Sequence, residues 1–158
     1  MLDPSSDQTL QPKPLGPEVP GWVAPPAPAR QTLAGRYCRL EPVVPQRHGA
    51  DLFAAQTQDR DGSGWTYLPY GPFADLEAYL AWMRATCLGD DPLFFAIVDR
   101  PAGRAIGLAS YLRIAPAAGS IEIGHLYFSP LLQRSRGALA APPISRANEP
   151  GSNATRRP

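Results

Sequence analysis

The side chains that most readily take part in chemistry are few in this chain. It has two cysteines, Cys38 and Cys87, and two histidines, His48 and His125. Because the cysteines form no C-x-x-C pair and only two histidines are present, the sequence predicts no zinc cluster or other metal site. We expect both thiols to be buried or half-buried in a reducing compartment, since unpaired cysteine is usually buried.

Glu122 and His125 lie three residues apart in one apolar segment, 120–128. The segment has the character of a β-strand, in which successive side chains point to opposite faces. Residues three apart therefore lie on opposite faces, so these two cannot line one pocket unless a β-bulge intervenes. Each also has a structural interpretation, namely a salt bridge or exposed position for Glu122 and a packed or surface position for His125.

An aromatic cluster lies within and just after a loop rich in Asp and Gly, over residues 58–73. Its large side chains are Trp65, Tyr67, Tyr70 and Phe73. Aromatic rings in a loop are costly to expose together, so we expect them either to cover the sheet or to line a binding pocket.

Two helices should support these groups. Pro45 can open a helix over residues 45–57, because its missing N–H would have no partner in the first turn. A clearer helix is expected over 74–88, with Asp75 and Glu77 in its first turn, where carboxylates favour the helix dipole. Its apolar side recurs at steps of three and four residues and comprises Phe73, Leu76, Leu80, Met83 and Cys87.

Four strands are expected, over residues 36–41, 93–98, 105–114 and 120–128. The turns between the last three are short, which favours an antiparallel meander. One strand, two helices and three antiparallel strands together predict an α+β fold.

Prolines gather near both ends of the chain, so we expect a disordered Pro-rich arm over 1–34, a folded domain over 35–134 and an irregular tail over 135–158. Within the arm, residues 25–30 match the P-x-x-P-x-R ligand of polyproline-binding domains, or else form a semi-rigid linker.

The net charge of +1 excludes an electrostatic attraction to nucleic acid or to an anionic membrane. The sequence contains neither a secretory signal nor an apolar run of membrane-spanning length, so we expect a cytoplasmic protein. Its oligomeric state is left open.

Four sequence blocks are informative because of their order and spacing along the chain. They are Gly35–Pro42, Trp65–Phe73, Phe94–Asp99 leading to Ile106-Gly107, and Ile121–Pro130. The last, Ile-Glu-Ile-Gly-His-Leu-Tyr-Phe-Ser-Pro, is the most specific. Together they resemble the first half of the GNAT superfamily of N-acetyltransferases, and more closely the Rim-type ribosomal-protein N-terminal acetyltransferases. The resemblance covers residues 35–134 and implies the N-terminal part of a GNAT fold.

The resemblance implies transfer of an acetyl group from acetyl-CoA to a primary amine, either a protein N-terminus or a small molecule, without a metal. The amine must lose a proton before attack. Glu122 is then the first candidate for the general base, through water, and His125 the second. Cosubstrate contacts are implied for Leu126, Tyr127, Phe128, Gln133 and Arg134. An acceptor pocket is implied for Trp65, Tyr67, Tyr70 and Phe73.

The family binds the cofactor diphosphate with a Q/R-x-x-G-x-G/A loop that opens the next helix. Residues 133–138 depart from it, because Arg136 stands where the first glycine belongs. The tail beyond is mostly Arg, Ala, Pro and Ser. We therefore expect a sequence that is C-terminally truncated or frameshifted near Arg134.

Such a chain would leave the edge of its last strand unpaired and be marginally stable, with little transferase activity. Two alternatives stay open. Another chain supplies the missing half of an active enzyme, or the chain is a non-catalytic binding fragment that uses the aromatic loop and the Pro-rich arm.

Overall fold

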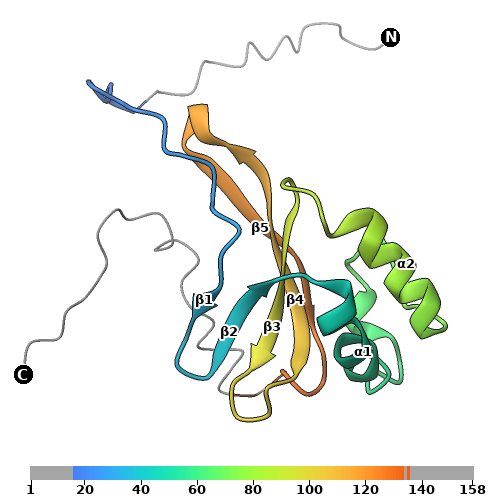
Figure 1. Cartoon of the computed structure of the whole chain (residues 1–158). Coiled ribbons are helices and arrows are strands. Elements are labelled where there is room, and N and C mark those ends of the chain that lie inside the picture. The colour runs from blue at the N-terminus through green and yellow to red at the C-terminus, as the bar shows by residue number, and fades with distance from the viewer. Residues whose placement is uncertain (1–15, 134, 136–158) are drawn as a thin grey trace, which may run out of the picture.

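The computed structural model describes residues 16–133 and residue 135. They form one antiparallel sheet with two helices on one of its faces (Figure 1). The sheet order is β1-β2-β3-β4-β5, with every neighbouring pair antiparallel. The strands are β1 (Leu33–Ala34), β2 (Cys38–Pro42), β3 (Leu93–Asp99), β4 (Ala105–Ala115) and β5 (Ser120–Phe128). The predicted α+β order is confirmed, and the short strand β1 is an addition to it.

Both expected helices are present. Helix α1 (Pro45–Gln56) begins at its proline, as predicted. Helix α2 (Leu76–Thr86) begins one residue after Asp75, whose carboxylate accepts a 2.8 Å hydrogen bond from the Ala78 N–H. Asp75 is thus the N-cap of α2 and not a member of its first turn, which is a common use of a short acidic side chain.

The predicted apolar side of α2 is wrong at one position. Leu76 is 37% exposed, whereas Tyr79 is buried in its place. The buried side therefore runs from Tyr79 through Met83 to Cys87. Leu76 is the first residue of α2 and lies at the exposed N-terminal end of this side.

Two apolar clusters lie on opposite faces of the sheet. The cluster under the helices includes Val43, Leu52, Trp65, Tyr79, Met83, Cys87, Phe94 and Tyr127. The cluster on the other face includes Cys38, Leu40, Leu93, Phe95, Ile97, Tyr111 and Leu132. Both thiols are buried, as expected from the sequence, one in each cluster.

Residues 16–34 contact the sheet instead of leaving it. They pass beside the β4–β5 hairpin and end in β1, which pairs with β2 (Figure 1). The Trp22 indole N–H lies 3.3 Å from the Ala117 carbonyl oxygen at the tip of that hairpin. Residues 1–15 of the expected arm, Arg134 at the end of the expected domain and residues 136–158 of the expected tail lie outside the described part of the chain.

Strand β5 is the last strand of the sheet, and its outer edge pairs with no strand among residues 16–133. Along it, Ile121, Ile123 and Leu126 are exposed. An unpaired apolar edge of this kind is available to another strand or to a ligand. Neither described helix is long and apolar enough to cross a membrane.

Candidate active site

A β-bulge interrupts the pairing of β4 with β5. Leu108 lies opposite Tyr127, but Ser110 lies opposite Gly124, so β5 carries one extra residue across this step. His125 lies within the bulge and has a φ of 51°. Such a backbone angle is uncommon outside glycine, and it marks the point where the alternation of β5 is broken.

The bulge brings Glu122 and His125 to the same face of the sheet. Phe94, Ser110 and Gly124 lie opposite one another across β3, β4 and β5, and therefore share the helix-covered face. Glu122, two residues before Gly124, points to this face as well. The ring of His125 also lies here, 5.1 Å from the Phe94 ring centroid. The structure thus contains the β-bulge without which Glu122 and His125 would lie on opposite faces of the strand.

His125 is held by the aromatic cluster. The Tyr70 hydroxyl lies 3.2 Å from the imidazole Nδ1, and the two rings stack with centroids 5.6 Å apart. Burial lowers the pKa of His125, and the nearby Glu122 charge offsets part of that effect. Burial also raises the pKa of the Tyr70 phenol, so this hydroxyl keeps its proton at neutral pH.

Glu122 is more exposed than His125 and forms an ion pair with Arg113. The Arg113 backbone is itself fixed, because the Asp91 carboxylate accepts hydrogen bonds of 2.9 and 3.0 Å from the N–H groups of Arg113 and Ile114. The structure thus places a solvent-accessible carboxylate on the hairpin, on the same face as the imidazole.

Three of the four predicted aromatic residues form one cluster around the end of β5. Trp65 is buried and stacks on Tyr127 at 4.2 Å between ring centroids. Tyr70 and Phe73 meet Trp65 edge-on at 6.1 and 5.7 Å. Tyr67 is 97% exposed and takes no part in this packing.

The sequence interpretation missed Trp82, whose ring packs against Tyr70 at a tilt of 35° with centroids 4.4 Å apart. Its position three residues after Tyr79 was a usable signal for the stacking of these two rings on one side of α2, but not for the contact with Tyr70. Phe94 was also missed as a neighbour of His125, because only the sheet register places it there.

The residues predicted to contact the cosubstrate do not share one face of the sheet. Leu126 is exposed on the free edge of β5, Tyr127 is buried under the helices, and Phe128 packs on the opposite face. Gln133 follows the strand and donates a 2.9 Å hydrogen bond from its amide to the Phe128 carbonyl. Arg134 lies outside the described residues, as do residues 136–138 of the expected diphosphate loop.

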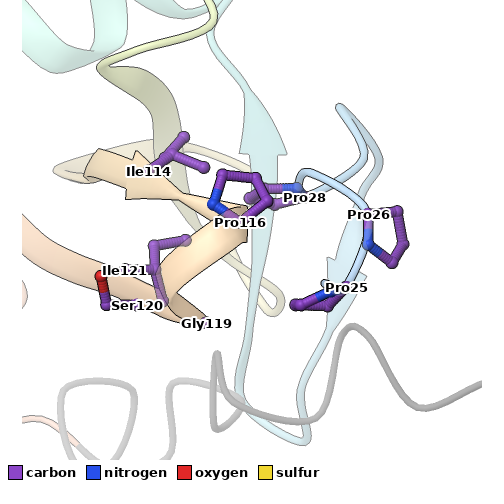
Figure 2. Close-up of a pocket in the computed structure, with 8 residues that line it drawn as sticks. All are labelled: Pro25, Pro26, Pro28, Ile114, Pro116, Gly119, Ser120 and Ile121. Atoms are coloured by element: carbon purple, nitrogen blue, oxygen red, sulfur yellow. The ribbon is translucent and has the colours of Figure 1, made fainter. Parts of the chain in front are cut away.

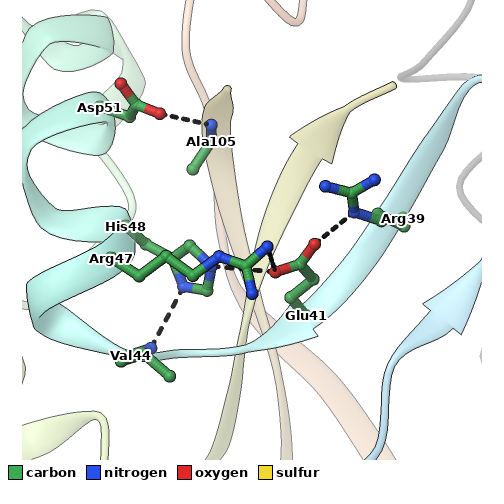
Figure 3. Close-up of polar contacts among 7 residues, drawn as sticks. All are labelled: Arg39, Glu41, Val44, Arg47, His48, Asp51 and Ala105. Carbon is green, nitrogen blue, oxygen red and sulfur yellow. Dashed lines mark hydrogen bonds and ion pairs between the residues drawn. The ribbon is translucent and has the colours of Figure 1, made fainter. Parts of the chain in front are cut away.

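A second cluster of charged side chains joins β2 to α1 (Figure 3). The Val44 N–H donates to His48 Nδ1 at 3.1 Å, and His48 Nε2 lies 3.2 Å from Glu41 Oε2. Arg47 reaches the same carboxylate oxygen at 2.9 Å, and Arg39 contacts the other oxygen. Every polar atom of the His48 ring is therefore used inside the fold.

A shallow groove separates the N-terminal segment from the β4–β5 hairpin. Figure 2 shows Pro25, Pro26 and Pro28 on one side of it, with Ile114 and Pro116 on the other. Arg30, the last residue of the P-x-x-P-x-R match, reaches the Leu88 carbonyl oxygen at 3.3 Å and the Asp90 carboxylate at 2.9 Å. This motif is thus engaged within the chain itself.

No group of three or more metal-binding side chains occurs within the described part of the chain. The described residues of the site offer an imidazole, a carboxylate and a phenol beside the interrupted edge of a sheet.

No family model matches this sequence, and no curated protein matches it. Solved structures do. A GCN5-related N-acetyltransferase from Brucella melitensis is 39% identical, with a TM-score of 0.73, and the match covers 76% of this chain and 54% of that one. A probable acetyltransferase of the GNAT family from Chromobacterium violaceum is 35% identical, with a TM-score of 0.69, covering 79% and 62%.

This chain therefore spans between half and two thirds of the length of the solved structures that it matches. The likeness in both sequence and architecture supports the GNAT superfamily. The described residues have a GNAT-like fold.

Proposed function

We propose that this chain carries part of the active site of an acyl-CoA-dependent N-acetyltransferase, which moves an acetyl group from acetyl-CoA to a primary amine. The observation that supports this most directly is the bulge of β5, which gathers Glu122 and His125 on one face beside an aromatic cluster. A bulge also leaves backbone groups of the strand without ladder partners, and these suit a linear, amide-containing cosubstrate.

Glu122 serves as the general base in this proposal. Its carboxylate pairs with Arg113 and reaches solvent, so it can accept the ammonium proton of the acceptor through a water molecule. Leu126, Tyr127 and Phe128 offer their backbone to the pantetheine arm, and Gln133 and Arg134 are proposed to contact the diphosphate. The aromatic residues Trp65, Tyr70 and Phe73 form the wall of the acceptor side.

The acceptor is proposed to be the N-terminal amine of a protein, as in the Rim-type enzymes that the sequence resembles, or a small amine. We also propose a cytoplasmic location and a low rate for the 158-residue chain alone. The low rate follows from the unpaired edge of β5 among the described residues and from the arginine in the expected diphosphate loop.

The test is a pair of measurements on the full 158-residue chain, first shown to be folded by circular dichroism. Thermal unfolding is followed with increasing acetyl-CoA, and transfer of labelled acetyl groups is followed with a panel of peptides and polyamines. We expect a saturable rise in Tm and slow transfer, below the roughly 1–1000 per second that is typical of enzymes. Glu122→Gln should keep the Tm shift and lose transfer.

A folded chain with neither a Tm shift nor transfer would favour the non-catalytic alternative, in which the chain is a binding fragment. Transfer that appears only after a second polypeptide is added would instead support an enzyme completed by another chain.

A further inference from the structure

The contact between Tyr70 and His125 fixes more than the position of the imidazole ring. The Tyr70 hydroxyl and His125 Nδ1 are 3.2 Å apart, and Phe94 and Trp82 pack against the two rings. The other ring nitrogen, Nε2, has no hydrogen-bond partner among residues 16–133. The direction of the bond at Nδ1 therefore decides what Nε2 can do.

The groups involved determine that direction. A phenol is a better donor than acceptor, and a neutral imidazole offers one accepting nitrogen and one N–H. Burial keeps Tyr70 protonated and His125 neutral at neutral pH, because it raises the pKa of the former and lowers that of the latter. Tyr70 then donates to Nδ1, and the single proton of the imidazole must lie on Nε2.

We propose that His125 is a hydrogen-bond donor through Nε2–H and not a base, and that Tyr70 is the positioning residue that holds it in this tautomer. The proposal rests on the acetyl transfer proposed above and divides the work between two side chains. Glu122, the carboxylate on the same face, accepts the proton of the amine, while His125 stabilises negative charge on the thioester.

In the transfer step the amine nitrogen uses its lone pair to form a bond to the thioester carbonyl carbon, and the carbonyl π electrons move to oxygen. His125 Nε2–H donates to that oxygen as its charge grows. The C=O bond then re-forms, the C–S bond breaks, and its electron pair leaves on sulfur. The proton lost from the amine passes through Glu122 and water, and the CoA thiolate takes up a proton from solvent.

The tautomer can be measured without any activity. The chain has only two histidines, so imidazole ¹⁵N spectra contain two sets of signals, which His48→Gln and His125→Gln assign. His48 is an internal reference, because its Nδ1 accepts from the Val44 N–H and its proton must lie on Nε2. We expect His125 to match His48 at pH 7.5 and Tyr70→Phe to shift His125, but not His48, toward a mixture of tautomers.

The role in transfer is tested by two substitutions with different chemistry. Glutamine keeps an N–H donor but cannot act as a base, whereas alanine has neither property. We expect His125→Ala to lower kcat roughly 100-fold, the loss typical of one oxyanion donor, and His125→Gln to retain kcat within about 10-fold. Tyr70→Phe should lower kcat less than His125→Ala and leave KM for acetyl-CoA unchanged.

Each unfavourable result has its own meaning. A proton on Nδ1 of His125 in the unmodified chain, or equal losses in the glutamine and alanine variants, would overturn the donor role. If the unmodified chain transfers no acetyl group, either alone or with a second polypeptide added, the proposed function fails and the catalytic role of His125 fails with it, whatever the tautomer.

Discussion

The two histidines of this chain occupy contrasting environments. His48 is 3% exposed between β2 and α1, and both of its ring nitrogens bond to groups of the fold. His125 lies half-buried in the bulge of an edge strand, where only Nδ1 has a partner among the described residues. A fully bonded imidazole has no group left for a ligand, so the comparison identifies His48 as structural and His125 as available for chemistry.

The same contrast holds for the two carboxylates. Glu41 is 5% exposed and receives contacts from Arg39, Arg47 and His48. Glu122 has one cationic partner, Arg113, and reaches solvent. A buried carboxylate with several partners is costly to remove from among them, whereas a partly exposed carboxylate with one cationic partner remains accessible to water and to a substrate.

The largest difference in stability between the two sites should appear when their carboxylates are removed. Glu41→Ala leaves the His48 N–H and two guanidinium groups without their buried acceptor, and we expect a loss of about 3 kcal/mol in the free energy of unfolding. Glu122→Ala should cost less than about 1 kcal/mol, because its ion pair is exposed. Urea unfolding of both variants, with Glu41→Gln as the isosteric control, measures the difference. Equal losses would contradict the assignment of Glu41 as the structural carboxylate.

A smaller effect should appear in the pH dependence of stability. Burial lowers the pKa of His48 below its ordinary value near 6.5, although its bond to Glu41 partly opposes this. The unfolded chain therefore binds a proton at His48 before the folded chain does, so stability is complete above pH 6.5 and falls as the pH drops toward the folded pKa.

His48→Gln should flatten the stability curve below about pH 6.5 more than His125→Gln does. Thermal unfolding across this range is the measurement. A curve that changes more with His125→Gln would show that the deeper burial of His48 does not control the acid response.

The smallest difference in the free energy of unfolding is expected between the two arginine variants. Arg113→Gln removes an exposed ion pair and should change the free energy of unfolding by less than about 0.5 kcal/mol. Arg39→Gln removes a partner of the buried Glu41 and should cost about 1 kcal/mol or more. Chemical denaturation of the two variants measures this difference. A larger loss of stability for Arg113→Gln would contradict the view that the Glu41 site is the structural one.

Periodicity and turn residues predicted most of the fold. The meander of β3, β4 and β5 follows from apolar segments separated by short turns, and Pro45 marks the start of α1. These features are local, so the sequence expresses them directly. The first turn of α2 was misplaced because Asp75 acts as a cap, and a capping side chain and a first-turn carboxylate look alike in sequence.

The site was only partly predictable. Glu122, His125 and Tyr70 were named from the sequence, but not the bond between Tyr70 and His125, whose partners lie 55 residues apart. Arg30 was interpreted as part of a polyproline ligand or linker, whereas it contacts the loop after α2. Contacts of this range depend on how segments pack, and spacing along the chain carries no record of them.

The sequence by itself determined which segments become strands and helices, because alternation and helical periodicity are properties of neighbouring residues. Only the tertiary structure decided that Glu122 and His125 share a face and that His48 does not join them. One extra residue in β5 reverses the side to which a side chain points, and only the register against β4 reveals that residue.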